Sequence, residues 1–171
     1  NLGRPQDIPF VIECLRAAVH VPDAFFVICG SGTEYGKLRT FVEAEKYSNL
    51  LLLSGLPRAD YDKLVRSCHV GLLFLDHRFT IPNFPSRLLS YLQAGLPVIA
   101  CTDPATDIGD IAQAGGFGWK CPSDDPAAFV RTVERACSAD LASMGDAGRM
   151  YFSAHYTAEQ SYEIIMRGLE R

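Results

Sequence analysis

Short apolar runs that alternate with helical segments constrain the fold of this chain more than any other feature. The runs are nearly continuous in apolar residues rather than alternating, as expected for strands that are covered on both faces. Strand, helix, strand, helix at this spacing predicts a parallel sheet with right-handed crossovers. We therefore expect an α/β fold of three α/β/α layers with a mostly parallel sheet. The five runs are AFFVIC (24–29), NLLLLSG (49–55), HVGLLFL (69–75), PVIAC (97–101) and FGWKC (117–121).

The two ends of the chain differ from this repeating middle. The opening NLG is interpreted as the end of a strand that begins before residue 1. After residue 122 the pattern predicts helices only, the second of them over about 140–154. Thr157 and Gln160 have the spacing of a capping box that opens a last helix, and apolar residues recur along one of its stripes (Tyr162, Ile165 and Leu169). We expect one domain over residues 1–171, covered at its C-terminal end by helices.

Composition excludes several classes of partner. The 171 residues carry a net charge of −4, which argues against a nucleic-acid-binding face or a polybasic membrane patch. A phosphate group would therefore be bound by a few local residues. The six cysteines are scattered without a CxxC pair, so free thiols are favoured over disulfide bridges or a zinc site. The four histidines show no ligand spacing, and we predict no metal site and no cofactor.

The segment GSGTEYGK (30–37) follows a predicted strand and is similar to several nucleotide-binding loops. A P-loop needs glycine where Ser31 stands and serine or threonine where Leu38 stands, so that comparison fails. The dinucleotide fingerprint needs a third glycine three residues after Gly32, where Tyr35 stands. What remains is a tight turn whose glycines allow backbone or ligand to come close. A plain strand-to-helix turn and a ligand contact both stay open.

Two acidic segments allow a structural and a functional interpretation. Asp60-Tyr61-Asp62 is an Asp-x-Asp sequence, the metal-binding signature of one class of sugar transferases, but it opens a predicted helix where carboxylates favour the helix dipole. We interpret it as structural. Asp76, His77 and Arg78 follow a predicted strand, where ligands bind in open α/β sheets. A solvated loop is the alternative there.

The stretch NFPSRLLSYLQAGLPVIA (83–100) predicts a short helix followed by a strand. Ser86 is the expected N-cap, Gly95 the C-terminal stop, and Leu88, Leu89 and Leu92 the buried stripe. The start of this helix faces the ligand edge of the sheet, so its free N–H groups form an anion site. Arg87 in the first turn opposes the helix dipole. A cation at that position points to a bound phosphate.

The same stretch resembles the PSK-x-x-E-Y-x-A-x-G-x-PVI segment of retaining nucleotide-sugar glycosyltransferases. These have the two-domain GT-B architecture, and the similar subgroup is classification family 4 with its bacterial surface-polysaccharide members. The resemblance covers nearly the whole chain in order, through NLGRPQDI, VICGSGTEYGKLR, LLLLSGLPRADYDKLVRSCHVGLLFL, GGFGWKCPSDDPAAFV and YFSAHYTAEQSY. It implies a Rossmann-like donor-binding domain, the C-terminal half of a longer chain whose acceptor domain lies outside these residues.

The resemblance also implies a metal-independent reaction and a set of donor-site residues. The donor would be a nucleoside-diphosphate sugar, with UDP favoured over GDP, and the acceptor a glycan or a lipid-linked sugar. The expected location is the cytoplasm, at the inner face of the cell membrane, with peripheral association of the full enzyme. The diphosphate would lie against Gly3, Arg4, Ser86 and Arg87, the nucleotide against Gly30, Ser31, Gly32 and Ser90, and the sugar near Asp76, His77, Arg78, Pro82 and Asn83.

The chain departs from the family at positions that matter. Two glutamates with seven residues between them are common in the family, and Pro82 and Ser90 stand in their places. A serine can make a hydrogen bond but cannot grip a diol with two oxygens. The lysine expected shortly after Arg4 is also absent, and Arg87 is a candidate replacement for its charge. Two alternatives stay open: a non-catalytic partner subunit with a degenerate donor site, and a nucleotide-sugar epimerase of related fold. No catalytic residue is assigned.

Overall fold

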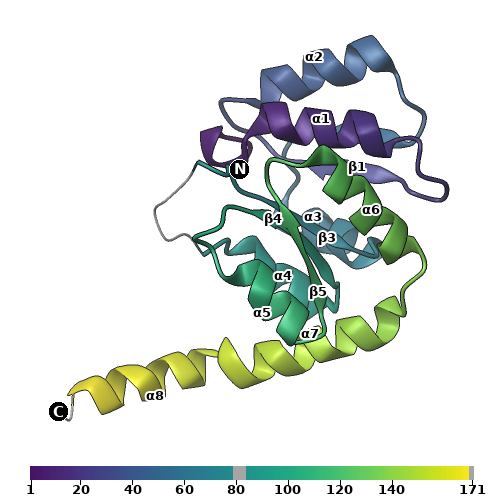
Figure 1. Cartoon of the computed structure of the whole chain (residues 1–171). Coiled ribbons are helices and arrows are strands. Elements are labelled where there is room, and N and C mark those ends of the chain that lie inside the picture. The colour runs from purple at the N-terminus through teal and green to yellow at the C-terminus, as the bar shows by residue number, and fades with distance from the viewer. Residues whose placement is uncertain (79–83, 170–171) are drawn as a thin grey trace.

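The computed structural model describes residues 1–78 and 84–169. Strands and helices alternate through the first two thirds of the chain, and helices follow (Figure 1). The strands are β1 (Phe26–Cys29), β2 (Leu50–Leu53), β3 (Gly71–Phe74), β4 (Val98–Thr102) and β5 (Gly118–Pro122). The helices are the 3₁₀-helix η1 (Arg4–Gln6) and the α-helices α1 (Ile8–Ala18), α2 (Tyr35–Glu45), α3 (Arg58–Ser67), α4 (Arg87–Ala94), α5 (Ile108–Ala114), α6 (Pro126–Cys137), α7 (Leu141–His155) and α8 (Ala158–Leu169).

All strand pairings among the described residues are parallel, which confirms the sequence prediction. β1 pairs with β2 in the register Phe26↔Leu50, and β4 pairs with β3 and β5 in the registers Gly71↔Val98 and Val98↔Gly118. The strands form two hydrogen-bonded groups, β1–β2 and β3–β4–β5, rather than one continuous ladder. The sequence did not predict this division.

The core lies on both faces of the sheet because successive residues of a strand point to opposite sides. In β4, Ile99 and Cys101 join the buried cluster under α1, α2 and α6, whereas Val98 and Ala100 join the cluster under α4, α5 and α7. All five residues of β4 are buried. The result is the expected three-layer α/β/α arrangement, with β4 at its centre (Figure 1).

Helix α4 is short because Gly95 ends it in the left-handed conformation, with φ of 74°. Leu88 and Leu92, one turn apart, are fully buried against the sheet, as the sequence predicted; Leu89 is only half-buried. Helix α7 packs across α4 at the same end, where Gly145 lies directly against the carbonyl group of Gly95. A Cβ atom at Gly145 would stand 2.1 Å from that carbonyl oxygen, so the contact requires glycine.

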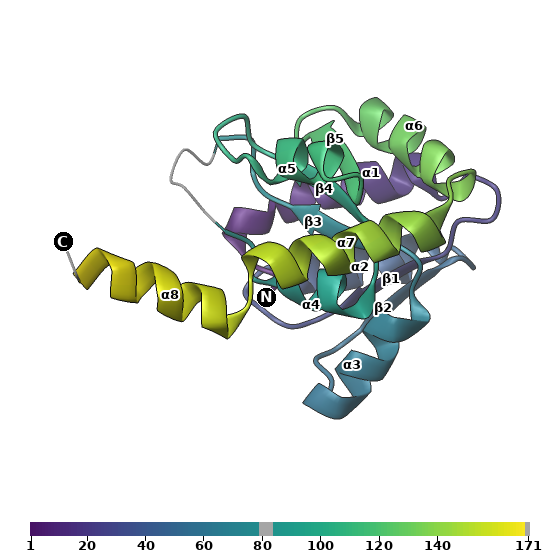
Figure 2. The same cartoon turned by 90° about the horizontal axis from the view of Figure 1, so that it is seen from below.

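The C-terminal helices cover the sheet only in part. α7 lies across the α4 side of the sheet, whereas α8 extends away from it and buries none of its residues (Figure 2). The expected stripe of Tyr162, Ile165 and Leu169 is therefore exposed. The capping box is half formed, because the Gln160 N–H donates to the Thr157 hydroxyl (3.3 Å) while the Gln160 side chain donates to the Ser153 carbonyl. None of the described helices combines the length and apolar character needed to cross a membrane.

The cysteines are free thiols, as the sequence predicted, although their burial differs. Cys14, Cys101 and Cys121 are buried, Cys29 and Cys68 are half-buried, and Cys137 is exposed.

We predict opposite effects from alanine at two helical glycines. Gly145→Ala should lower the free energy of unfolding by about 1–3 kcal/mol, because the new methyl group would force α7 away from α4. Gly36→Ala in α2 should leave it unchanged or raise it by about 0.5 kcal/mol, because no atom lies within 4 Å of the new Cβ and alanine favours the helix. Urea denaturation of both variants measures the difference. Equal effects would contradict the proposed α4–α7 contact.

Candidate functional site

Residues 1–5 connect the carboxyl ends of the two strand groups. The Leu2 N–H donates to the Ser31 carbonyl (2.9 Å), and the Leu2 carbonyl accepts from the Glu34 N–H (3.0 Å), so this segment pairs with the loop after β1. The Pro5 carbonyl accepts from the N–H of Asp76, in the loop after β3 (2.9 Å). The three loops that the sequence assigned to one site are therefore neighbours at one edge of the sheet.

The glycines after β1 are explained in part by this contact. Gly32 has φ of 154°, and a Cβ atom there would stand 2.4 Å from the Leu2 carbonyl oxygen. Its glycine is thus required by the chain's own backbone, and Gly32 lines neither of the two cavities found at this edge. Gly30 and Ser31 do line the larger cavity. Within this loop, Gly32 therefore serves the turn, whereas Gly30 and Ser31 border a cavity.

A polar cavity of about 370 Å³ lies at the start of α4. Ser86, Arg87 and Ser90 reach it from the helix because the first two open α4 and Ser90 stands one turn after Ser86. Sequence reasoning missed most of the other walls, which come from four separate segments. The lining residues are Asn1, Gln6, Tyr61, Leu73, Phe74, Leu75, Phe84, Pro85, Ser86, Arg87 and Ser90.

The start of α4 differs from the expected capped end. Ser86 holds the N-cap position, but its side chain makes no capping hydrogen bond, so the prediction of a hydroxyl cap was wrong. The N–H groups of Leu88 and Leu89 instead donate to the carbonyls of Pro85 and Ser86 (2.8 and 3.2 Å). These turn bonds replace the cap. The Ser86 side chain is exposed, and its hydroxyl makes no hydrogen bond to the N–H groups at the start of the helix.

Arg87 is a half-buried cation whose guanidinium group has no ion pair among the described residues. Its Nη2 donates to the Asn1 carbonyl (3.2 Å). Burial raises the pKa of Tyr61, and the positive charge of Arg87 partly offsets that rise. Burial likewise raises the pKa of Tyr91, again opposed by Arg87. The guanidinium group is therefore a local positive charge at this cavity, close to the neutral phenol of Tyr61, which lines it, and to that of Tyr91, which lines only the larger cavity.

Gly3 and Arg4 lie beside the cavities but line neither of them. The Gly3 N–H donates to the Gln6 side chain (3.0 Å), and Arg4 is exposed at the start of η1. Gln6, which the sequence did not single out, lines both cavities from the same turn. The expected Pro82 and Asn83 lie outside the described residues.

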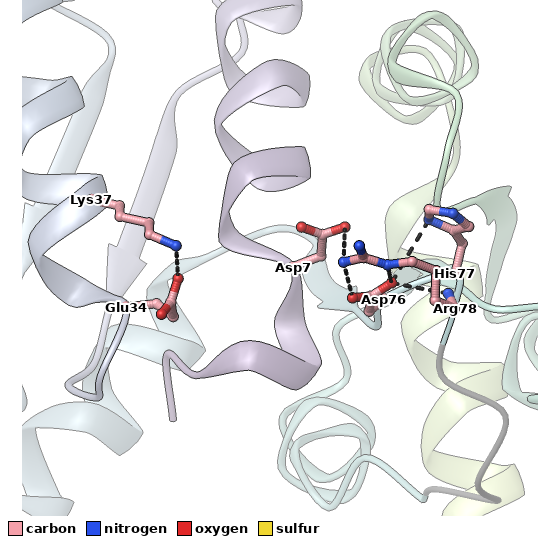
Figure 3. A network of polar contacts seen from close by, with 6 residues as sticks. All are labelled: Asp7, Glu34, Lys37, Asp76, His77 and Arg78. Carbon is pink, nitrogen blue, oxygen red and sulfur yellow. Dashed lines mark hydrogen bonds and ion pairs between the residues drawn. The ribbon is translucent and has the colours of Figure 1, made fainter.

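Asp76, His77 and Arg78 form a charged cluster with Asp7, which precedes α1 (Figure 3). The Arg78 Nε and backbone N–H both donate to Asp76 Oδ1 (2.8 and 2.9 Å), and its Nη2 approaches Asp7 (3.8 Å). Hydrogen bonding from Arg78 holds the pKa of Asp76 below its usual value. In the same view Glu34, the residue before α2, forms a separate ion pair with Lys37 in the first turn of that helix (Figure 3).

The charged cluster also contains one set of side chains with metal-ligand geometry. One oxygen of Asp7, one of Asp76 and a ring nitrogen of His77 all lie within 4.8 Å of one another. The sequence did not reveal this set because Asp7 is far from the other two along the chain. Arg78 pairs closely with Asp76 and approaches Asp7 (3.8 Å), so it offsets part of the negative charge of the cluster, and we assign no metal to it.

The acidic Asp60 and Asp62 lie near the start of a helix, as the sequence predicted, and both form ion pairs there. Both lie on α3, where Lys63 pairs with Asp60 (3.1 Å) and Arg58 pairs with Asp62 (3.0 Å). Tyr61 between them is different, since it lines both cavities. The sequence did not indicate Tyr61 as a site residue, because an aromatic residue between two aspartates is not by itself a sign of a ligand site.

The fold and the polar edge define a parallel α/β domain with cavities where the strands end. Residues 2–139 match the model of a protein family described as "Glycosyl transferases group 1". The chain belongs to this family. It is 26% identical over 163 residues to "Probable glycosyltransferase WbjE" of Pseudomonas aeruginosa, in an alignment that covers 95% of this chain and 40% of the relative.

Several solved structures share the fold. Anabaena Alr3699/HepE, solved in complex with UDP, superposes with a TM-score of 0.73 at 16% identity, covering 96% of this chain and 45% of that one. WaaG, a glycosyltransferase of lipopolysaccharide biosynthesis, gives a TM-score of 0.64 at 17% identity, covering 89% of this chain and 40% of that one. The chain thus spans less than half the length of each of these proteins.

The Asp76–Arg78 interaction predicts a specific pH dependence of stability. A lowered carboxyl pKa in the folded state stabilises the protein above the unfolded value of about 3.9, and this stability is lost as the pH falls through the folded value. Arg78→Ala should therefore lower the free energy of unfolding at pH 5 and above, by an amount that shrinks below about pH 4. Urea unfolding between pH 2.5 and 7 measures this.

Carbon-13 NMR titration of Asp76 should show its pKa rising in Arg78→Ala. Arg58→Ala is the matched control, because it removes an exposed ion pair within α3 and leaves the cluster intact. An Asp76 titration that is the same in wild type and Arg78→Ala would contradict the assignment.

Proposed function

We propose that residues 1–171 form the nucleotide-sugar donor-binding domain of a GT-B glycosyltransferase. The full enzyme would transfer a sugar from a nucleoside diphosphate to a glycan or lipid-linked acceptor during synthesis of a cell-surface polysaccharide. The proposal is supported by the family match, by the partial coverage of longer relatives, and by the relatives' own descriptions as glycosyltransferases. The UDP bound by HepE favours a uridine nucleotide over a guanosine nucleotide.

One observation connects the proposed function with a particular cavity. Arg87 is half-buried and faces a polar cavity at the carboxyl edge of the sheet, and no described carboxylate neutralises it. A partly desolvated cation gains most from an anion that can enter its cavity. Ligands of open parallel sheets bind at this edge. A diphosphate has the charge and the hydrogen-bond acceptors that such a site requires.

The reaction leaves a nucleoside diphosphate whose negative charge grows as the bond to the sugar breaks. Arg87 and the N-terminal end of α4 would stabilise that charge without a metal ion, because positive groups already oriented toward it need no rearrangement. Ser86 would donate its hydroxyl to a phosphate oxygen, and Ser90, one turn further, would meet the ribose. Gly30 and Ser31 would contact the nucleotide from the other side. Arg4 would approach from η1, at the outer rim.

Arg87→Ala should weaken the binding of UDP by about tenfold or more, because it removes a charge-assisted hydrogen bond. Calorimetric titration of the purified chain with UDP measures the affinity. Arg135→Ala is the matched control, since Arg135 is an exposed arginine of α6 that lines neither cavity. Unchanged affinity in Arg87→Ala, or equal losses in the two variants, would refute the assignment of Arg87.

The nucleobase can be determined by thermal unfolding in the presence of uridine, guanosine and adenosine diphosphates. A ligand that binds only the folded state raises the melting temperature according to its concentration over Kd. We expect UDP at millimolar concentration to give the largest rise. The chain alone should bind nucleotide without transferring sugar, since the acceptor domain would lie outside it.

The second candidate function is a non-catalytic GT-B subunit with a degenerate donor site. Ser90 favours it, because this half-buried position of the cavity carries a hydroxyl where the family commonly has a carboxylate. Ser90→Glu tests the choice: in a working donor site the carboxylate should strengthen UDP binding severalfold by accepting two hydrogen bonds from the ribose diol. No binding of any nucleoside diphosphate by either protein would select the subunit. An epimerase would instead convert the nucleotide sugar into an isomer and release it when no acceptor is present.

The proposed location is the cytoplasm, at the inner face of the membrane. A lipid-linked acceptor would require the full enzyme to meet the membrane surface. The net charge of −4 makes a polybasic contact through this domain unfavourable, so peripheral association would use other parts of the enzyme.

A further inference from the structure

The two cavities at the carboxyl edge of the sheet share part of their walls. At this edge the larger cavity is lined by the loops after β1 and β2, through Ser31 and Leu56, whereas the smaller cavity opens at the start of α4. The residues that line both cavities are Asn1, Gln6, Tyr61, Phe74 and Arg87. Besides Arg87, this border contains two side chains on helices that can donate hydrogen bonds, Gln6 and Tyr61.

Gln6 is the last residue of η1, and one hydrogen bond fixes the orientation of its amide group. The Gly3 N–H donates to Gln6 Oε1 (3.0 Å). Because a backbone N–H can donate only to the amide oxygen, this bond also determines which atom of the side chain is Nε2. None of the described residues accepts a hydrogen bond from Nε2. The half-buried side chain therefore keeps both amide N–H donors for a ligand.

Tyr61 reaches the same border from α3, and its hydroxyl group is able to turn toward a ligand. The neighbouring phenol is that of Tyr91, whose hydroxyl donates a long hydrogen bond to the Leu72 carbonyl (3.5 Å). Burial raises the pKa of Tyr61, so its hydroxyl keeps its proton at neutral pH. A hydroxyl group rotates to suit its partner, and an anion is a stronger acceptor than a second phenol.

The charge of the smaller cavity favours an anion at this border. Of the described residues that line this cavity, none is an aspartate or a glutamate, and Arg87 supplies a positive charge. Neutral donors beside a half-buried cation can form charge-assisted hydrogen bonds to an anion without the repulsion of a second cation. The diphosphate of a nucleotide sugar lies between the nucleoside and the sugar. A border between two cavities, with donors from η1, α3 and α4, therefore fits the diphosphate.

On the basis of the donor-binding function proposed above, we infer that Gln6 and Tyr61 bind the diphosphate of the donor together with Arg87. Gln6 Nε2 would donate to a phosphate oxygen from η1, and the Tyr61 hydroxyl would donate from α3. The nucleoside would then extend toward Ser31, and the sugar toward Ser86. Both residues would distinguish a diphosphate from a neutral ligand, because each of their bonds is strengthened by the negative charge.

Gln6→Glu tests the role of the amide group. The carboxylate still accepts a hydrogen bond from the Gly3 N–H, but it replaces the amide donor with a negative charge. We expect the variant to bind UDP and inorganic pyrophosphate about thirtyfold or more weakly, as measured by calorimetric titration for UDP and by NMR titration for pyrophosphate. Gln113→Glu is the matched control, because it adds the same charge at an exposed position of α5 that lines neither cavity.

Tyr61→Phe tests the hydroxyl group, because it keeps the ring that lines both cavities. The variant should bind UDP and pyrophosphate about tenfold more weakly than the wild type. Tyr47→Phe is the matched control, since the Tyr47 hydroxyl donates to Glu45 (3.2 Å) and Tyr47 lines neither cavity. A loss with UDP but not with pyrophosphate would place Tyr61 at the nucleoside and overturn its assignment to the diphosphate.

A measurement on the wild-type chain covers the case in which a variant fails to fold. The side-chain amide signals of Gln6 in nitrogen-15 NMR spectra should shift in a saturable manner as pyrophosphate or UDP is added, whereas those of Gln113 should stay in place. Unshifted Gln6 signals at saturation, or equal affinities in the wild type and both variants, would overturn this inference and leave the proposed function intact. If the wild type bound neither pyrophosphate nor any nucleoside diphosphate, both would be overturned.

Discussion

The hydrogen bonds that residues 1–5 make to the loops after β1 and β3 are the contact on which the site depends. Through Leu2 and Pro5 this segment places the ends of two strand groups that share no ladder at the same edge of the molecule. Gly32 permits the contact, since any side chain there would meet the Leu2 carbonyl. Arg87 is tied to the same segment through the Asn1 carbonyl. The cavity at the start of α4 is bounded by this arrangement rather than by any single motif.

The alternation of apolar runs and helical segments was sufficient to predict the layers, the parallel pairing and all five strands. Each of these follows from local composition and from the rule that neighbouring strand–helix units pack with one hand. The division of the sheet into two groups could not be predicted in this way. It depends on which backbone edges find a partner, and single-strand patterns such as AFFVIC and HVGLLFL do not carry that information.

The candidate site was predicted less completely than the fold. Ser86 and Arg87 were found because they open a helix that faces the ligand edge of the sheet, and Ser90 because the family resemblance places that position at the nucleotide. Gln6 and Tyr61 were missed because they reach the cavity from segments far apart in sequence, and ordinary helix composition explains both of them locally. The hydroxyl cap at Ser86 was wrong because backbone turn bonds from Leu88 and Leu89 take its place. The approach of Asp7 to Asp76 likewise depends on tertiary packing.

The two faces of helix α4 have separate roles. Leu88 and Leu92 are fully buried on one side, while Ser86 and Ser90 border the cavity on the other. Substitutions on the cavity side leave the packed side unchanged, so the chemistry of the site can diverge during evolution without loss of the core. A serine in place of a carboxylate at Ser90 is the kind of change such a helix tolerates. The shortness of α4 also limits the site, because a helix of eight residues offers a ligand only one polar turn.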